Sequence, residues 1–170
     1  KLLYLLGSDN LEIKKNNEFI VYQGSHGDKG AEIADIVLPS PAYTEKEGLY
    51  SNLEGRVQEC RKASYPTGEA LEDWKIFNLI SNKIYGTKLF DSHLSIRKST
   101  LKEIKNFSEI DLLPMKEITK SSNALDNFTE EQVSVNNIDY YFSNSIARAS
   151  KTMSDCRNIG LKNKKNGTNN

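Results

Sequence analysis

The sequence has no excess of either charge, no long apolar run and almost no cysteine. Lysine plus arginine and aspartate plus glutamate number 23 each, so no overall field draws the chain to nucleic acid or anionic lipid. No apolar run approaches the roughly 20 residues that a helix needs to cross a bilayer. We therefore expect neither a nucleic-acid partner nor direct insertion into a membrane.

The only cysteines are Cys60 and Cys156. They are far apart and lack the spacing of a metal motif, so they neither form a disulfide framework nor bind a cluster alone. Reduced thiols in an intracellular compartment are the simpler expectation. The sequence also has no Cys-x-x-Cys, no cluster of metal ligands and no plausible Ser–His–Asp set. Nothing in it, taken alone, specifies an enzyme.

Three short apolar runs are typical of strands in a parallel sheet. They are residues 2–6, 19–22 and 33–38. Continuous rather than alternating hydrophobicity is the pattern of strands covered on both faces. Before the third run, Asp28 is expected to cap about one helical turn. Pro39 and Pro41 are expected to end the third strand, and a long irregular segment should follow.

The covering helices that such a sheet needs are almost absent from residues 1–66. A parallel crossover usually takes a dozen or more residues and a helix, so we expect the missing helices from another chain or from an upstream part of the same protein. We expect the sequence to begin at Lys1 inside this domain rather than at the domain's first residue. The predicted fold class is α/β: an incomplete Rossmann-like parallel sheet over 1–66, a mainly helical part over 67–157, and a disordered tail over 158–170.

Three helices are expected after the sheet. They run from an N-cap at Thr67 to Gly86, over residues 94–106, and from Ser143 or Ser145 to about Asp155. In the first, an apolar stripe has helical spacing; its members are Leu71, Trp74, Phe77, Ile80 and Ile84. Trp74 is the expected buried anchor.

The loop after the second apolar run contains Gly24, Gly27 and Gly30. Its backbone amides could cradle a phosphate, but the G-x-x-G-x-x-G spacing is neither the dinucleotide fingerprint nor a P-loop. A structural turn that needs positive φ is the favoured interpretation. His26 beside Asp28 could form an oriented imidazole. Because no nucleophile is obviously aimed at His26, we assign it no catalytic role.

Arg56 follows Gly55 in the polar segment after the sheet. Its guanidinium could bind a carboxylate, a phosphate or a backbone carbonyl, and an internal salt bridge is the favoured interpretation. Glu45, Glu47 and Glu54 are too dispersed to act as paired carboxylates, so solvated or salt-bridged positions are expected. No catalytic, cofactor-binding or metal-binding residue is therefore assigned to this chain.

Several segments resemble a known family. The segments ADIVLPSPAYTEKEGLYSNLEGRVQ (34–58) and PTGEALEDWKI (66–76) resemble the molybdopterin oxidoreductase superfamily, which includes formate dehydrogenases and nitrate reductases. Within it, YQGSHGDKGAEIADIVLP (22–39) and the C-terminal YYFSNSIARASKTMSDC (140–156) are similar to one branch: the large iron–sulfur subunits of respiratory complex I, the NADH:quinone oxidoreductase. The resemblance covers most of residues 1–156.

This resemblance implies a role rather than a reaction. In that family the iron–sulfur clusters sit near the N-terminus on cysteine-rich motifs, and the molybdenum ligand of catalytic relatives also lies upstream of this region. Cys60 and Cys156 match none of these motifs, so no cofactor is expected in this chain, and iron–sulfur clusters and flavin are expected elsewhere in the complex. The implied function is a non-catalytic structural and assembly part of the peripheral-arm iron–sulfur subunit of complex I, supporting electron transfer from NADH to quinone.

The resemblance also implies partners and a location. The expected partners are the cluster-bearing N-terminal part of the same subunit, on a separate chain, and other peripheral-arm subunits. A bias of 18 lysines to 5 arginines, with 17 asparagines, favours the matrix side of the mitochondrial inner membrane over the cytoplasmic face of a bacterial membrane. Two other hypotheses stay open: a C-terminal fragment of an active molybdopterin oxidoreductase such as a formate dehydrogenase, or a free-standing phosphate-binding module.

Overall fold

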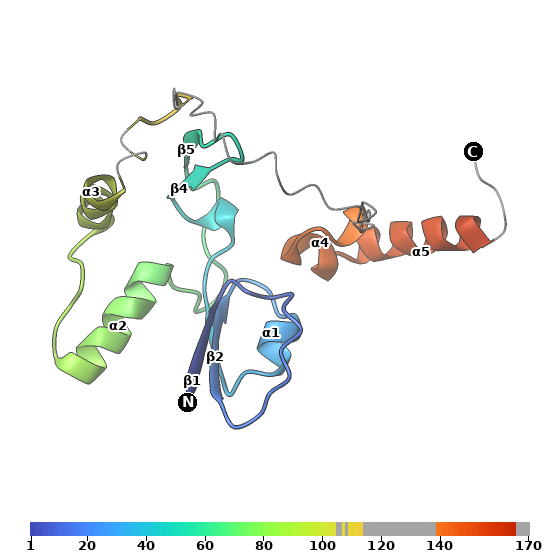
Figure 1. Cartoon of the computed structure of the whole chain (residues 1–170), viewed down its shortest axis with the longest axis horizontal. Coiled ribbons are helices and arrows are strands. Elements are labelled where there is room, and N and C mark those ends of the chain that lie inside the picture. The colour runs from blue at the N-terminus through green and yellow to red at the C-terminus, as the bar shows by residue number, and fades with distance from the viewer. Residues whose placement is uncertain (105–106, 108, 114–138, 166–170) are drawn as a thin grey trace, which may run out of the picture. The chain divides into compact units, whose positions relative to one another are not determined.

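The computed structural model describes residues 1–104, 107, 109–113 and 139–165, with the side chains of the last helix described through residue 162. The chain divides into two compact units, Lys1–Pro114 and Met115–Asn170. In the described ranges the first unit is mixed α/β and the second is helical (Figure 1). The predicted α/β class is confirmed at this level. The predicted division at residue 66 stays a prediction.

Three parallel strands form the centre of the first unit. They are β1 (Leu2–Leu6), β2 (Phe19–Gly24) and β3 (Ile36–Pro39), in the order β1-β2-β3. β1 and β2 lie where the apolar runs predicted them, but β3 begins at Ile36 rather than at residue 33. The reason is helix α1 (Lys29–Glu32), which the predicted cap Asp28 begins and Ile33 ends. The backbone after Ile33 is therefore still turning toward the strand.

One face of this sheet is covered by the chain itself over β1 and β2, whereas Val37 of β3, on the same face, is 51% exposed. Leu5, Ile20 and Tyr22 form a buried cluster on that face. Partly buried apolar side chains pack against them from β1, from the loop before β2 and from around α1; these are Leu3, Ile13, Ala31, Ile33 and Ala34. Burial on this face agrees with the coverage expected for parallel strands.

The opposite face is only partly covered. Its centre is Val21 on the middle strand, which is 8% exposed. Beside it, the ring of Tyr4 stacks on Phe77 with the centroids 5.7 Å apart. The parallel register pairs Leu2 with Phe19, and Val21 with Ile36, and side chains alternate between faces along each strand. Four apolar side chains therefore share this face around Tyr4: Leu2, Leu6, Phe19 and Ile36. These four, here called the open sheet face, are 44 to 67% exposed.

The segment after β3 was predicted to be irregular, but it contains regular elements. It contains a 3-10 turn, η1 (Tyr43–Glu45), and an antiparallel hairpin of β4 (Gly48–Ser51) and β5 (Val57–Cys60). Asn52 closes the hairpin loop, because its N–H donates to the Arg56 carbonyl and its Oδ1 accepts from the Arg56 N–H, both at 3.0 Å. Gly55 supplies the positive φ that such a loop needs, 83°. Strands of four residues are too short to stand out in a hydrophobicity pattern.

Helix α2 (Asp73–Tyr85) starts later than predicted. Its N-cap is Glu72 rather than Thr67. Gly68 has a φ of 60°, and the Leu71 N–H donates to the carbonyl of Pro39 at 3.2 Å. The residues before Glu72 are therefore tied to the end of β3 in a non-helical conformation.

The end of α2 was predicted correctly, and its apolar stripe only in part, since Phe77 packs on Tyr4. Gly86 ends the helix in the left-handed conformation, at φ 70°. Ile76 is buried, whereas Trp74 is only partly buried and Ile84 is exposed. The predicted role of Trp74 as the buried anchor was therefore wrong. Helix α3 (His93–Glu103) follows, with Ser92 and Ser95 forming its capping box.

The described part of the second unit contains η3 (Tyr140–Phe142), α4 (Ser145–Ala149) and α5 (Lys151–Lys165). Asn144, not a serine, caps α4 by accepting the Ala147 N–H at 2.9 Å. α5 continues ten residues beyond the predicted end near Asp155, so residues 158–165 of the predicted tail are helical. Arg157 holds this helix to η3, because it pairs with Asp139 at 2.5 Å and lies 4.8 Å from the Phe142 ring centroid.

Residues 114–138 of the predicted helical part and 166–170 of the predicted tail lie outside the described residues. None of the helices in the described ranges is long and apolar enough to cross a membrane.

Candidate functional site

The glycine loop, Gly24–Gly30, wraps around the ring of Tyr22. This side chain is 2% exposed, and its hydroxyl donates to the carbonyl of His26 at 2.7 Å. A Cβ added to Gly24 would overlap the Tyr22 hydroxyl, and one added to Gly30 would lie 2.6 Å from a backbone carbonyl oxygen. No glycine of the loop has positive φ. The predicted reason for these glycines was therefore wrong: they permit close approach of ring and backbone.

Two backbone amides of this loop, those of Lys29 and Gly30, already have partners inside the chain. The Lys29 N–H donates to Asp28 Oδ1 at 2.9 Å, and the Gly30 N–H donates to the carbonyl of Asp9 at 3.2 Å. A phosphate cradle needs free amides that converge on one anion. The amides of Lys29 and Gly30 are therefore not available to a phosphate.

The imidazole of His26 contacts Ser25, its neighbour in the sequence. His26 Nδ1 lies 3.0 Å from Ser25 Oγ at an exposed position, and the tautomer decides which atom donates. One oxygen of the Asp28 carboxylate accepts the Lys29 N–H instead, as the cap of α1. An activated serine needs a base that a third group orients, and an exposed contact between sequence neighbours does not supply that group. We therefore assign no catalytic role to this pair.

Arg56 does not form the predicted internal salt bridge with any described residue. Its Nε atom is buried and has no hydrogen-bond partner there. The predicted dispersal of the carboxylates matches what the structure shows: Glu45 accepts the Ala42 N–H at 3.0 Å, and Glu54 accepts from the Asn52 amide at 3.3 Å. These contacts shape turns, and they do not bring Glu45 and Glu54 together as a pair.

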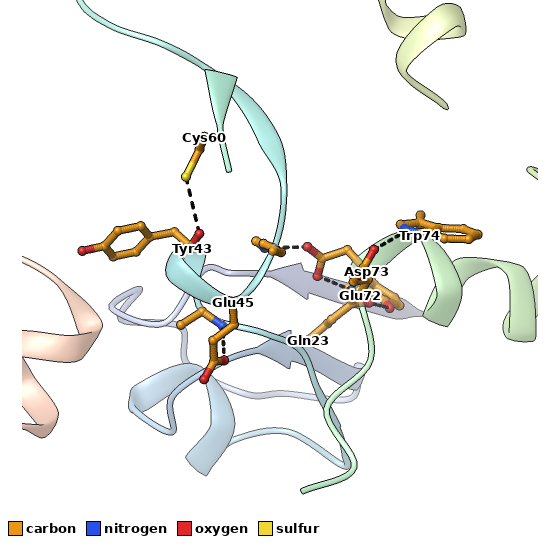
Figure 2. Close-up of polar contacts among 10 residues, drawn as sticks. Gln23, Tyr43, Glu45, Cys60, Glu72, Asp73 and Trp74 are labelled. Carbon is orange, nitrogen blue, oxygen red and sulfur yellow. Dashed lines mark hydrogen bonds and ion pairs between the residues drawn. The ribbon is translucent and has the colours of Figure 1, made fainter. Parts of the chain in front are cut away.

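A polar chain that the sequence did not predict joins the sheet to α2. Gln23 is 0% exposed; its Oε1 accepts from the Tyr4 hydroxyl, and its Nε2 donates to Asp73 Oδ1 at 2.7 Å (Figure 2). Lys46 Nζ lies 2.6 Å from the other oxygen of Asp73. The sequence carried a signal for this chain: Gln23 directly follows the apolar run of a predicted buried strand, and a buried amide requires hydrogen-bond partners.

The same chain affects the titration of Tyr4. Burial, and then the negative charge of Asp73, raises the pKa of the Tyr4 hydroxyl. The hydroxyl therefore keeps its proton at neutral pH and remains the donor to Gln23.

A pocket of about 260 Å³ lies between the hairpin, the start of α2 and α3. Two ion pairs lie in its wall: Lys46 with Asp73, and Arg97 with Glu59 at 2.7 Å. The hydrogen bond from Arg97, with its charge, lowers the pKa of the Glu59 carboxyl. The other lining residues are Glu47, Gly48, Leu49, Glu72, Trp74, His93, Ile96, Thr100 and Phe107.

No group of three or more His, Cys, Asp and Glu side chains in the described part of the chain is placed to hold a metal ion. Cys60 Sγ lies 3.6 Å from the carbonyl of Tyr43 (Figure 2), and Cys156 is exposed. Among the residues singled out in the sequence, the loop glycines, Asp28, Glu45 and Glu54 therefore form turns and packing contacts. The unpredicted features are the Gln23 polar chain and the pocket.

The α/β unit, with its glycine loop, is similar to molybdopterin oxidoreductase domains. The family model with that description matches residues 1–83. A second family model, which describes the C-terminal region of the G subunit of NADH-ubiquinone oxidoreductase, matches residues 112–156.

Curated relatives narrow the class to one family. The chain is 39% identical to the NADH-ubiquinone oxidoreductase 75 kDa subunit of Reclinomonas americana, over 92% of this chain and 23% of that protein. It is 39% identical to the G subunit of the NADH-quinone oxidoreductase of Rickettsia felis, over 98% of this chain and 24% of that protein. It is also 39% identical to the mitochondrial NADH-ubiquinone oxidoreductase 78 kDa subunit of Candida albicans, over 92% of this chain and 23% of that protein.

The chain therefore belongs to the family of NADH-quinone oxidoreductase G subunits, and it spans about a quarter of the length of the relatives that it matches. The resemblance drawn from the sequence is confirmed. The names of these relatives do not favour the formate dehydrogenase alternative.

Gly30→Ala is expected to lower the free energy of unfolding by about 1–3 kcal/mol, the usual cost of overpacking. Its Cβ would meet a backbone carbonyl and the buried Tyr22 ring. Gly27→Ala is the matched control, because a Cβ there would contact only Ala31 Cβ, at 4.0 Å. Urea unfolding followed by the fluorescence of Trp74, the single tryptophan, measures both. Equal losses for the two variants would contradict the close-approach explanation.

Gln23→Leu should destabilise the chain by about 1–3 kcal/mol, since it leaves Tyr4 and Asp73 without their buried partner. Gln58→Leu, on the exposed side of β5, is the control and should change stability little. The same urea titration compares them. A Gln23→Leu variant as stable as Gln58→Leu would mean that the polar chain does not hold α2 to the sheet.

The contribution of Tyr4 should depend on pH. Because its pKa is raised on folding, the contribution is fully present below the unfolded pKa of about 10 and is lost as the pH rises through the folded value. The difference in unfolding free energy between the unmodified chain and Tyr4→Phe should therefore shrink above about pH 10. Urea midpoints measured from neutral to alkaline pH test this, and a difference that stays constant is the contrary result.

Proposed function

We propose that this chain is a non-catalytic structural and assembly part of the peripheral-arm iron–sulfur subunit of complex I. In this role it supports electron transfer from NADH to quinone without carrying the electrons. Family membership supports the proposal, and the observation that carries it is the open sheet face. Four apolar side chains of one sheet face are 44 to 67% exposed, whereas parallel sheets are almost always covered on both faces.

The cover for this face comes from the rest of the subunit. The order β1-β2-β3 leaves both outer strands as edges, and exposed edges invite pairing with further strands. In this proposal the three strands are an incomplete piece of a Rossmann-like sheet, and residues 67–157 are the extension that follows it. Full burial of a Leu, Ile or Phe side chain contributes about 1.5–3 kcal/mol, so closing the open sheet face would supply a substantial docking energy.

The partners in this proposal are the cluster-bearing N-terminal part of the subunit, as a separate polypeptide, and other peripheral-arm subunits. The iron–sulfur clusters and the flavin belong to those partners, and this chain holds no cofactor. We place the assembly on the matrix side of the mitochondrial inner membrane, with the cytoplasmic face of a bacterial membrane as the alternative. The lysine and asparagine bias and the mitochondrial name of the Candida relative support the first location.

Purification of the native complex that contains this chain tests the membership. We expect NADH dehydrogenase subunits to co-purify, with this chain as its own band on a denaturing gel. Metal analysis of the same preparation should give iron without stoichiometric molybdenum or tungsten. Co-purification with a molybdenum-containing oxidoreductase would instead establish the alternative function.

Leu6→Asp is expected to block assembly through the open sheet face. A free-energy change of roughly 1.4 kcal/mol alters a binding constant tenfold, and burial of an unpaired carboxylate costs well over that amount. The amount of chain in the complex should therefore fall by about tenfold or more. Leu53→Asp is the control, because Leu53 is fully exposed in the hairpin loop. Quantitative mass spectrometry of the isolated complex measures both variants. Normal incorporation of Leu6→Asp would show that this face is not an interface.

A further inference from the structure

The pocket between the hairpin, α2 and α3 differs in size from a cofactor site. Its volume of about 260 Å³ is below the roughly 300–1,000 Å³ of typical ligand pockets. A single large side chain of a partner is therefore a better match for this space than a nucleotide or a pterin.

The pocket lining has more negative than positive charge. It contains four carboxylates and two permanent cations, and both cations are already paired, Lys46 with Asp73 and Arg97 with Glu59. The remaining carboxylates have weaker partners. Glu47 lies 3.6 Å from His93, which is charged only when protonated. Glu72 lies 3.9 Å from Lys75, whose ammonium also lies 5.5 Å from the Trp74 ring centroid, a position that an incoming cation would have to share or take over. The site is thus complementary to an added positive charge.

The apolar part of the lining fits a cation that is flat and carried on an aliphatic stem. Leu49, Ile96 and Phe107 line the pocket together with Trp74. The indole N–H of Trp74 donates to Glu72 Oε2 at 2.7 Å (Figure 2), so an aromatic ring and a carboxylate are held next to each other. A guanidinium can stack on an indole and bind a carboxylate through two N–H groups, which an ammonium cannot do.

We propose that this pocket receives an arginine side chain from a segment of a partner protein. Arginine and tryptophan are enriched at the energetic centres of protein interfaces, and the two least-paired carboxylates, Glu47 and Glu72, would bind the guanidinium. The proposal goes beyond assembly through the open sheet face, because it names a second interface and the side chain that enters it.

Photo-crosslinking in the native assembly tests the pocket. The full chain carries p-benzoylphenylalanine in place of Ile96, or in place of Thr100 should the first variant fail to assemble. Mass spectrometry then identifies the cross-linked peptides. We expect an acceptor segment from another polypeptide with an arginine within a few residues of the attachment point.

The double variant Glu47→Gln with Glu72→Gln should lower the cross-linked yield by about tenfold. Glutamine keeps an acceptor for the Trp74 N–H and removes only the charge. Glu69→Gln, an exposed carboxylate outside the pocket, is the control and should leave the yield unchanged. A yield that the double variant does not alter would overturn the proposal, as would an acceptor without arginine or no acceptor on another polypeptide. An arginine-bearing acceptor from outside complex I would support the pocket and contradict the proposed function.

Discussion

A buried amide in the middle strand is the constraint on which the first unit depends. Gln23 is fully inaccessible, and a buried amide without partners costs about 1–3 kcal/mol. Its partners come from three separate segments: Tyr4 on β1, Asp73 at the start of α2 and, through Asp73, Lys46 in the segment before β4. The hydrogen bonds that Gln23 needs therefore determine how the sheet, the segment before β4 and helix α2 contact one another.

The same arrangement explains which features the sequence could predict. Local signals placed β1, β2, the Asp28 cap and the Gly86 helix end, because hydrophobic runs and capping residues act over a few positions. The start of α2 depends instead on a hydrogen bond from Leu71 to Pro39, two residues far apart in the sequence. The pairing of Arg157 in α5 with Asp139 likewise joins residues that are 18 positions apart. Such contacts leave little trace in a pattern read along the chain.

The candidate site shows the same limit. Sequence reasoning identified the glycine loop and gave the wrong reason for it, since the glycines make room for the Tyr22 ring rather than for a left-handed turn. The loop lies at the edge of an α/β unit, and its Lys29 and Gly30 amides donate to Asp28 and Asp9 of the same chain. In the proposed role this edge is packing, and the surfaces that act on other molecules are the open sheet face and the pocket beside α3.

In the proposed role, the open sheet face is covered in the assembled complex. Hydroxyl-radical footprinting of the native complex and of the isolated chain measures it directly, because oxidation reports the solvent exposure of individual side chains. We expect Leu2, Leu6, Phe19 and Ile36 to be oxidised in the isolated chain and strongly protected in the complex, with Leu53 equally oxidised in both. Equal oxidation of the four side chains in both states would contradict it.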